Sequence, residues 1–466
     1  MDAAMKEFLG VGESLTFYSL IVDFAIASLF LLIGQWIRAK VRIVQKFFLP
    51  ASILAGFMGL FLGQHFLNVL PFSGAQSQYT TYLIVIVFTI VGVDGFDLQK
   101  RGETGGQVLR DLIGFQCYRG VAFFLQFIIP FVATFLIIQK IWPDVSSGFA
   151  IICAAGFQGG PGTAAAVGST FAELGWNEAT DLGITSATIG ILTGIFGGLA
   201  YIKWGTKKGI TNFVKDFNQI DEDTRRGIIS KANRESIGDD TMSVVSLDTL
   251  TFHLGIILTV AIAGCFLNKF LGAYVLSGIP DFTVAYLLGL VFSIVAKKFT
   301  KLYDYYESGI TNKISCTCTD YLVFFGIATI NPQVVIKYAG PLVIMAITGI
   351  LCCVVVVVPF ANLMIRHNWF EKSMFVFGYC TGVFANSFIL LRMCDPKYES
   401  GCVEDIAATP LMSFVEVFCW AFMPGALLAG QGWLIVAICT AATIACIVVS
   451  ILVGSWYPKL PLVRRD

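Results

Sequence analysis

Long apolar runs separated by short polar connections recur along the whole chain. A helix that spans a membrane needs roughly 20 apolar residues, because each residue rises about 1.5 Å through a hydrocarbon core about 30 Å thick. The pattern therefore predicts an all-α polytopic membrane protein. The predicted spans are 16–37, 48–69, 79–93, 112–138, 185–203, 250–266, 281–296, 318–330, 338–365, 410–428 and 432–456.

Two further apolar stretches, 145–171 and 374–393, do not fit as ordinary spans because glycines and small polar residues interrupt both. Basic residues cluster in alternate connections, at 38–46, 100–110, 204–249, 297–313 and 459–465. Basic connections face the cytoplasm. The alternation holds only if each interrupted stretch enters and leaves on one side. We therefore predict two re-entrant hairpins from opposite faces, an outside N-terminus and a cytoplasmic C-terminus.

The two halves of the chain repeat each other in a consistent register. The paired segments are Leu49-Pro50 with Ile279-Pro280, Thr81-Tyr82-Leu83 with Asp320-Tyr321-Leu322, and 156–160 with 378–382. Each half holds five spans and a hairpin, and the odd number of spans inverts the second copy. The predicted organisation is a first repeat at 1–203, a cytoplasmic charged linker at 204–249, a second repeat at 250–431, and an extra span and tail at 432–466. Chance similarity between apolar segments is the alternative.

Composition agrees with a membrane protein and excludes several other classes. Hydrophobic residues make up 56% and charged residues 13%, whereas soluble chains carry about 25% charged residues. A soluble enzyme and a nucleic-acid binder are therefore excluded. Three His residues, far apart in sequence, and 13 Cys, mostly in apolar runs, match no metal-hydrolase, redox or ATPase motif. We expect no enzyme activity and no cofactor.

Inverted repeats with interrupted apolar segments are typical of secondary transporters, whose sites lie near the midplane. The first hairpin offers Gly159, Gly160, Pro161, Gly162 and Thr163. Glycine lets a ligand approach the backbone, proline ends a helix, and free carbonyls with a hydroxyl suit Na⁺. We predict Gly159 and Thr163 as ion ligands, and Gly160, Gly162 and Thr163 as substrate contacts. Close helix packing through small residues is the alternative.

Hydroxyl groups at the start of the span 185–203 extend the predicted ion site. Ser186 and Thr188 lie where a hairpin turn could meet them, although the glycine spacing of 190–198 also indicates helix packing. Charged groups inside a membrane are functional candidates by default. Glu416 follows the second hairpin in sequence, so we predict it as the acidic ligand of the coupling ion.

The second hairpin offers candidate substrate contacts in Thr381, Asn386 and Ser387. Asn386 is the only amide in its apolar stretch. Arg392 follows closely, and a guanidinium can hold a carboxylate with two hydrogen bonds. Arg392 is equally well explained as an anchor at the inner membrane face.

At the hairpins the chain resembles the glutamate:sodium symporter family. The resemblance rests on Gly159-Gly160-x-Gly162-Thr163, Asn177-x-Ala179-Thr180, Ala187-Thr188-x-Gly190 with Gly197-Gly198, and Gly378-x-Cys380. It implies Na⁺-coupled uptake of an acidic amino acid such as glutamate, an inverted-repeat fold, a homodimer in the cell (inner or plasma) membrane and elevator-type movement. Pro161 stands where the family has a His, and 383–387 replaces a second glycine-rich run, so another substrate stays open.

Residues and resemblance together predict a secondary transporter that carries a small anion such as glutamate inward with Na⁺ by alternating access. Its predicted partners are glutamate, Na⁺, membrane lipid and a second copy of the chain, without nucleic acid. The alternatives are transport of another small organic anion or amino acid coupled to H⁺ or Na⁺, and antiport. A channel, a membrane-embedded enzyme and a receptor are weaker because the chain offers few titratable groups and no sizeable soluble domain.

Overall fold

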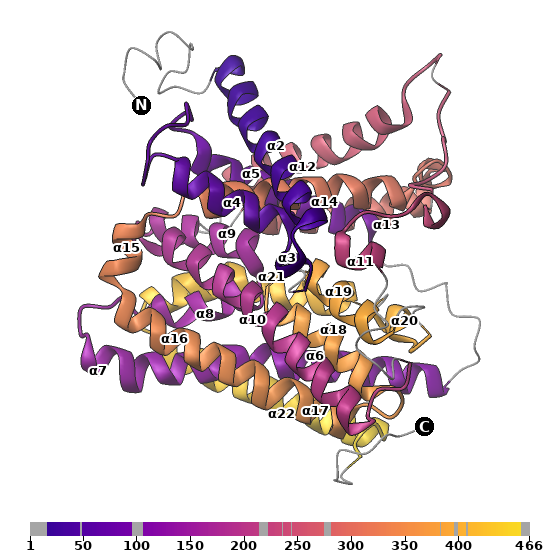
Figure 1. Cartoon of the computed structure of the whole chain (residues 1–466). Coiled ribbons are helices and arrows are strands. Elements are labelled where there is room, and N and C mark those ends of the chain that lie inside the picture. Colours follow the sequence, from indigo (N-terminus) through magenta and orange to yellow (C-terminus); the bar gives the residue numbers. More distant parts are fainter. Residues whose placement is uncertain are drawn as a thin grey trace. The chain divides into compact units, whose positions relative to one another are not determined.

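The computed structural model describes residues 16–46, 49–95, 106–213, 222–234, 236–243, 245–274, 281–382, 384–395, 399–406 and 409–457 (Figure 1). Within these ranges the chain is helical and contains no strand. The predicted tail beyond 457 and parts of the predicted linker, such as 214–221, lie outside the described residues. The chain divides into two compact units: Met1–Gln45, Leu49–Gly95 and Arg226–Pro332 form the first, and Lys46–Phe48, Phe96–Arg225 and Gln333–Asp466 the second.

Each unit takes helices from both predicted repeats. The first contains α2 (Phe17–Lys40), α4 (Ala51–Leu62), α5 (Gln76–Asp94), α12 (Thr249–Tyr274), α13 (Asp281–Phe299) and α14 (Ser308–Ala328). In this unit α5 packs against α13, and α14 packs against both α4 and α5. Its core is rich in aromatic side chains: Phe30, Phe72, Tyr79, Phe324 and Phe325 are buried together. The repeats themselves stay a prediction.

A buried carboxylate ties the loop before α5 to the first helix of the first unit. Asp23 on α2 is fully buried. It accepts a hydrogen bond from the backbone N–H of Ser73 at 2.9 Å, one from the Ser73 hydroxyl, and one from the Tyr79 hydroxyl at 2.7 Å. A buried charge is tolerated when hydrogen bonds replace its water. The intramembrane acid of the first predicted span therefore has its own partners within this unit.

The second unit contains the two interrupted stretches and the helices around them. Its elements are α6 (Gly106–Ala133), η1 (Thr134–Ile138), α7 (Gln139–Ile141), α8 (Phe149–Phe157), α9 (Gly160–Glu173), α10 (Ala179–Lys208), α16 (Ala339–Cys352), η5 (Cys353–Val357), α17 (Val358–Met364), α18 (Trp369–Tyr379), α19 (Phe384–Cys394), α20 (Cys402–Ile406), α21 (Thr409–Leu428) and α22 (Gly432–Val453). The shorter elements α3 (Arg42–Lys46), α11 (Glu222–Arg226), η3 (Lys231–Asn233), η4 (Leu302–Asp304) and α15 (Pro332–Lys337) lie in connections.

The first interrupted stretch forms a helical hairpin from α8 and α9. A Cβ atom on Gly148, just before α8, would lie 2.8 Å from atoms of Phe171 in the last turn of α9 and of Trp176, three residues after that helix. The start and the end of the stretch are therefore together. Gly160, the first residue of α9, has φ +71°, a left-handed conformation that glycine adopts without strain.

The second stretch forms a hairpin from α18 and α19, which we call the second hairpin. Gly382, with φ +152°, lies in its turn. A Cβ atom on Gly378 would lie 2.6 Å from the backbone of Ser387, so the two helices nearly touch at the turn. Both stretches thus fold back on themselves. Their entry into a membrane from opposite faces stays a prediction.

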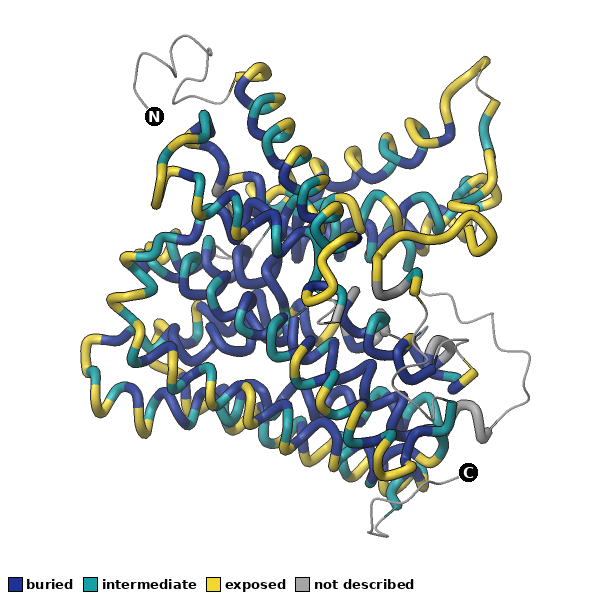
Figure 2. The backbone as a smooth tube through the Cα atoms, viewed as in Figure 1, coloured by how far each residue is buried: buried dark blue, intermediate teal, exposed yellow. Residues whose placement is uncertain are grey.

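Seven described helices are long and apolar enough to cross a membrane, and they match predicted spans. They are Phe17–Lys40, Arg110–Ile141, Ala179–Lys208, Thr249–Leu271, Asp281–Phe299, Ala339–Met364 and Gly432–Val453. Along α22 buried and exposed residues alternate with the helical turn (Figure 2), and its exposed face includes Trp433, Leu434 and Ile438. An exposed apolar helix face fits contact with lipid.

Three other predicted spans correspond to shorter apolar helices, and several boundaries were wrong, including those of 185–203, which is a helix over Ala179–Lys208, and of 250–266, which continues to Tyr274. Ala51–Leu62, Gln78–Asp94 and Phe414–Leu428 are the shorter helices. The span predicted at 48–69 ends as a helix at Leu62, and the chain then turns. The span predicted to start at 318 is part of α14, which starts at Ser308. Its first turns are polar, and buried Thr311 donates a hydrogen bond to Asp94 at 3.0 Å, which a hydropathy pattern cannot show.

Candidate functional site

One face of α10 brings the two hairpins together. A Cβ atom on Gly183 would lie 3.0 Å from the carbonyl oxygen of Ala164 on α9. A Cβ atom on Gly190 would lie 3.1 Å from the Cα atom of Phe157, the last residue of α8, and 3.1 Å from the carbonyl oxygen of Thr381 in the second hairpin. Both hairpins therefore meet the same glycine near the middle of α10.

The following glycines of α10 continue along the second hairpin. A Cβ atom on Gly194 would overlap the hydroxyl of Thr381 and lie 3.4 Å from the side-chain nitrogen of Asn386. A Cβ atom on Gly198 would lie 2.5 Å from Leu390. The GxxxG spacing therefore serves close packing, as it does in many membrane helices. The same packing brings the candidate polar residues of the second hairpin to α10.

Three of the predicted site residues carry buried polar atoms that lack a hydrogen-bond partner in the described part of the chain. They are the hydroxyls of Ser186 and Ser387 and both side-chain polar atoms of Asn386. Ser186 and Ser387 are fully buried and Asn386 is 2% exposed. Most buried polar groups in proteins are hydrogen-bonded, and each unsatisfied one costs about 1–3 kcal/mol. Buried polar groups without a protein partner are candidate contacts for a ligand.

A small cavity adjoins Asn386 and has room for about one water molecule. Its walls come from α10 and α19, and Asn386 is the only polar side chain among them. The lining residues are Gly194, Ile195, Leu199, Asn386, Ile389, Leu390 and Met393. Pockets for small-molecule ligands usually measure about 300–1,000 Å³. In this conformation the second hairpin therefore packs too closely on α10 to admit an amino acid.

The hydroxyls of the other predicted ligands, Thr188, Thr381 and Thr163, have different surroundings. Thr188 donates to the carbonyl of Ile184 at 2.9 Å, and Thr381 donates to the carbonyl of Phe377 at 2.7 Å. Each still has lone pairs for an ion or a donor. Thr163 is buried on α9 and lies next to where a side chain on Gly159 would be.

Gly160 and Gly162 are buried in the first turn of α9, at a helix N-terminus where N–H groups are free to hold an anion. Arg392 on α19 is exposed, whereas Asn386 on the same helix is buried. The two residues are six positions apart, so they face different directions. The structure therefore does not bring Arg392 to the unsatisfied groups, and a role for it in substrate binding stays a prediction.

Glu416 is buried against two partners that sequence analysis did not assign to it. The guanidinium of Arg119 on α6 donates to its carboxylate at 3.2 Å, and the hydroxyl of Tyr379 donates to its other oxygen. The carboxylate therefore already has a counter-ion. Its role as an ion ligand stays untested.

Two amides belong to the same region and were missed from the sequence. The side-chain oxygens of Gln126 on α6 and of Gln158 in the first hairpin turn are buried without a partner in the described chain. Gln126 donates its amide to the carbonyl of Cys380 at 2.7 Å. Both stand among apolar or small residues, so the argument that singled out Asn386, an amide in an apolar stretch, would have found them.

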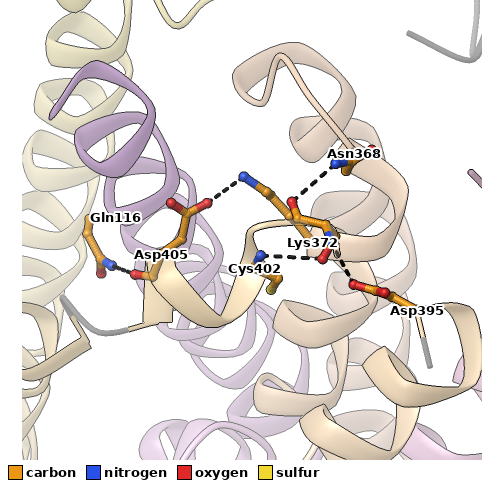
Figure 3. A network of polar contacts seen from close by, with 7 residues as sticks. Gln116, Asn368, Lys372, Asp395, Cys402 and Asp405 are labelled. Atoms are coloured by element: carbon orange, nitrogen blue, oxygen red, sulfur yellow. Dashed lines mark hydrogen bonds and ion pairs between the residues drawn. The ribbon is translucent and has the colours of Figure 1, made fainter. Parts of the chain in front are cut away.

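A second polar cluster lies at the base of the second hairpin, away from its turn (Figure 3). Lys372 on α18 is paired with Asp405 on α20 at 2.5 Å, and both are buried. Gln116 on α6 donates to the carbonyl of Asp405 at 3.0 Å. Asn368 donates to the carbonyl of Ser400 at 3.1 Å. These contacts join α18 to α20 and to neighbouring segments, so this cluster fixes the base of the second hairpin.

An ion pair outside the spans holds the N-terminus of α10. Lys337 at the end of α15 donates to Glu178, the N-cap residue of α10, at 2.9 Å. This hydrogen bond holds the pKa of the Glu178 carboxyl below its usual range. The pair is largely exposed, so its contribution to stability is small.

A family model described as sodium/glutamate symporter matches residues 17–382. The chain belongs to the sodium/glutamate symporter family. This confirms the resemblance seen at the hairpins. The family is one of transporters, not enzymes, with Na⁺ as coupling ion and glutamate as transported solute, which agrees with a multi-pass membrane protein. No curated protein matches the chain.

In this symporter the family match covers the first hairpin, α10 and the arm of the second hairpin up to Gly382. It ends before Asn386 and Ser387. Two of the unsatisfied residues therefore lie outside the part of the chain that the family model describes. The ion-site candidates Thr163 and Ser186 lie inside it.

We predict that Gly194→Ala lowers transport at least about tenfold and destabilises the protein by about 1–3 kcal/mol, because the added methyl group overpacks the second hairpin. Gly425→Ala on α21 is the matched control, since a Cβ atom there meets nothing within 4 Å. Uptake and the thermal midpoint in detergent would be measured. Equal activity of the two variants would contradict close packing at Gly194.

Proposed function

We propose that this symporter carries glutamate into the cell with Na⁺, and that both bind where the hairpins meet the middle of α10. The observation that supports this most strongly is the set of buried, unpartnered polar atoms on Ser186, Asn386 and Ser387. A solute and an ion would supply the missing partners.

The ion is held by oxygen atoms. Na⁺ prefers hard oxygen ligands, and the backbone carbonyl of Gly159 with the hydroxyls of Thr163, Ser186 and Thr188 are the proposed set. All lie in the first hairpin or the first turns of α10. Cβ contacts place Ser186 directly against Gly156 near the end of α8. We do not include Glu416 here, because Arg119 and Tyr379 already occupy its carboxylate.

The solute is held by dipoles rather than by a buried cation. The N-terminus of α9 at Gly160 and Gly162 offers free N–H groups and a partial positive charge to a carboxylate. Thr381, Asn386 and Ser387 supply hydroxyl and amide groups from the second hairpin. Because the cavity beside Asn386 is small, the turn of the second hairpin must move to admit the solute.

We also propose elevator-type movement in a homodimer. Every residue of the proposed site belongs to the second unit, which supports a mechanism in which one unit carries the solute. The proposed orientation has re-entrant hairpins, an outside N-terminus, a cytoplasmic linker at 204–249 and a cytoplasmic C-terminus, in the inner or plasma membrane. The clusters of basic residues support it.

We predict opposite effects of Ser387→Ala on stability and on binding. Removing an unpartnered hydroxyl removes a desolvation penalty of about 1–3 kcal/mol, so the ligand-free protein becomes more stable. The same change weakens stabilisation by glutamate with Na⁺. The matched control is Ser373→Ala on α18, also fully buried, whose hydroxyl donates to the carbonyl of Phe370 at 2.6 Å. Thermal midpoints with and without ligands separate the two variants. A Ser387→Ala variant that is less stable without ligand and binds normally would contradict the site.

Uptake of labelled glutamate into proteoliposomes tests the function directly. We expect accumulation only with an inward Na⁺ gradient, and little accumulation when K⁺ replaces Na⁺, because the gradient supplies the driving force. An inward H⁺ gradient and a panel of dicarboxylates and amino acids serve as the other arms. Uptake that is the same with and without a Na⁺ gradient would refute coupling to Na⁺. Accumulation of another anion but not of glutamate would refute glutamate as the substrate.

A further inference from the structure

A stripe of polar side chains on α6 follows the second hairpin and the segment after it. Gln116, Arg119 and Gln126 are spaced by three and seven residues, which places them on one face of the helix. Gln116 contacts Asp405, Arg119 contacts Glu416, and Gln126 contacts Cys380. Gln116 and Arg119 also bond each other at 3.3 Å. These three residues belong neither to the proposed ion site nor to the proposed solute site.

Tyr379 is where the stripe meets the turn of the second hairpin. It is the last residue of α18, and its hydroxyl donates to Glu416. The guanidinium of Arg119 lies 4.5 Å from the centre of its ring and pairs with the same carboxylate. Arg119 is 2% exposed and Glu416 is 7% exposed. A buried guanidinium and a buried carboxylate stabilise a structure only when they keep each other as partners, so this group has one preferred arrangement.

The next residue of the turn is held from two sides. The carbonyl of Cys380 accepts a hydrogen bond from Gln126 at 2.7 Å and one from the thiol of Cys353 at 3.4 Å. Cys353 opens the π-helical segment η5. Thr381, the residue after Cys380, packs on Gly190 and Gly194 of α10. The contacts that hold Cys380 therefore also set the position of Thr381.

The hydroxyls of two tyrosines fix η5 itself. A π-helical segment loses regular helical hydrogen bonds and leaves carbonyls that need other donors. Tyr118 donates to the carbonyl of Val357 at 2.7 Å, and Tyr201 donates to the carbonyl of Val354 at 2.6 Å. Through Cys353 these bonds also support the turn of the second hairpin, in addition to its contact with Gln126 of α6.

We propose that Arg119, Glu416, Tyr379 and Gln126 form a latch that sets the position of the second hairpin turn and thereby the affinity for solute and ion. Tyr379 and Gln126 are positioning residues that act through Cys380 and Thr381. Glu416 is the counter-ion of Arg119, not a ligand of Na⁺. The effect on affinity rests on the proposed function, whereas the latch itself does not.

Cys380 is a natural reporter of the latch because it lies in the turn and is 1% exposed. The full-length protein in detergent would be treated with N-ethylmaleimide, and the labelling rate of Cys380 measured by mass spectrometry. Cys439 on α22, fully buried, reports general loosening. Tyr379→Phe keeps the ring beside Arg119 and removes only the hydroxyl, and Gln126→Leu removes the amide. Tyr321→Phe is the matched control, since its hydroxyl bonds Ser28 in the first unit at 2.6 Å.

We expect Tyr379→Phe and Gln126→Leu each to raise the labelling rate of Cys380 about tenfold, because a lost hydrogen bond to a charged or buried group shifts the opening equilibrium by that order. Cys439 and the Tyr321→Phe control stay at the wild-type rate. Unchanged labelling of Cys380, or a parallel rise at Cys439, would overturn the latch. Glutamate with Na⁺ should slow labelling in the wild type. If glutamate with Na⁺ did not slow labelling, the result would count against the proposed site but would not contradict the latch.

The role of Glu416 is tested by neutralising both charges. Arg119→Gln and Glu416→Gln alone each leave a buried charge without its partner, so we expect both single variants to be poorly folded. The double variant should recover a homogeneous elution profile and retain thermal stabilisation by Na⁺ at wild-type concentrations. A folded double variant that no longer responds to Na⁺ would show that Glu416 is an ion ligand and overturn this assignment.

Discussion

Close backbone approach at the glycines of α10 is the constraint on which the second unit depends. At Gly190 a Cβ atom would lie 3.1 Å from both Phe157 and the carbonyl of Thr381, so a larger residue would separate the two hairpins. Non-helical backbone at membrane depth is tolerated only where protein or a cavity surrounds it. The glycine face of α10 provides that surrounding for both hairpins. Along this helix Ser186 lies against Gly156 of the first hairpin, and Asn386 of the second hairpin lies beside Gly194.

Charged and neutral polar groups have separate roles around this contact. Four buried charged side chains of the second unit form two ion pairs, Arg119 with Glu416 and Lys372 with Asp405. The first pair joins α6 to α21 and meets the second hairpin near its turn through Tyr379, and the second ties the base of the hairpin to α20. The groups left without partners at the proposed site are neutral. An empty site costs less free energy inside a membrane when its groups are uncharged than when they are charged. In this account the ion pairs stabilise the fold, and neutral polar groups bind the ligand.

Sequence reasoning predicted elements whose physical cause is local. The runs that became α10 and α22 are long and apolar. The hairpin turns contain Gly160 and Gly382, whose positive φ angles suit glycine. It failed where the cause is a distant partner. Within the polar first turns of α14, Thr311 is buried and bonds Asp94, 217 residues away. Arg119 and Glu416 form an ion pair across 297 residues of chain, which the local pattern around either residue does not indicate. The grouping of helices into two units also depends on packing that chain order does not specify.

The most direct test of this account is a cryo-electron microscopy structure of the protein in lipid nanodiscs with glutamate and Na⁺. The account predicts solute density within hydrogen-bond distance of Asn386 and Ser387, ion density at Ser186, and a second hairpin turn displaced from α10. Density at another place, with these three side chains still buried and without partners, would contradict it.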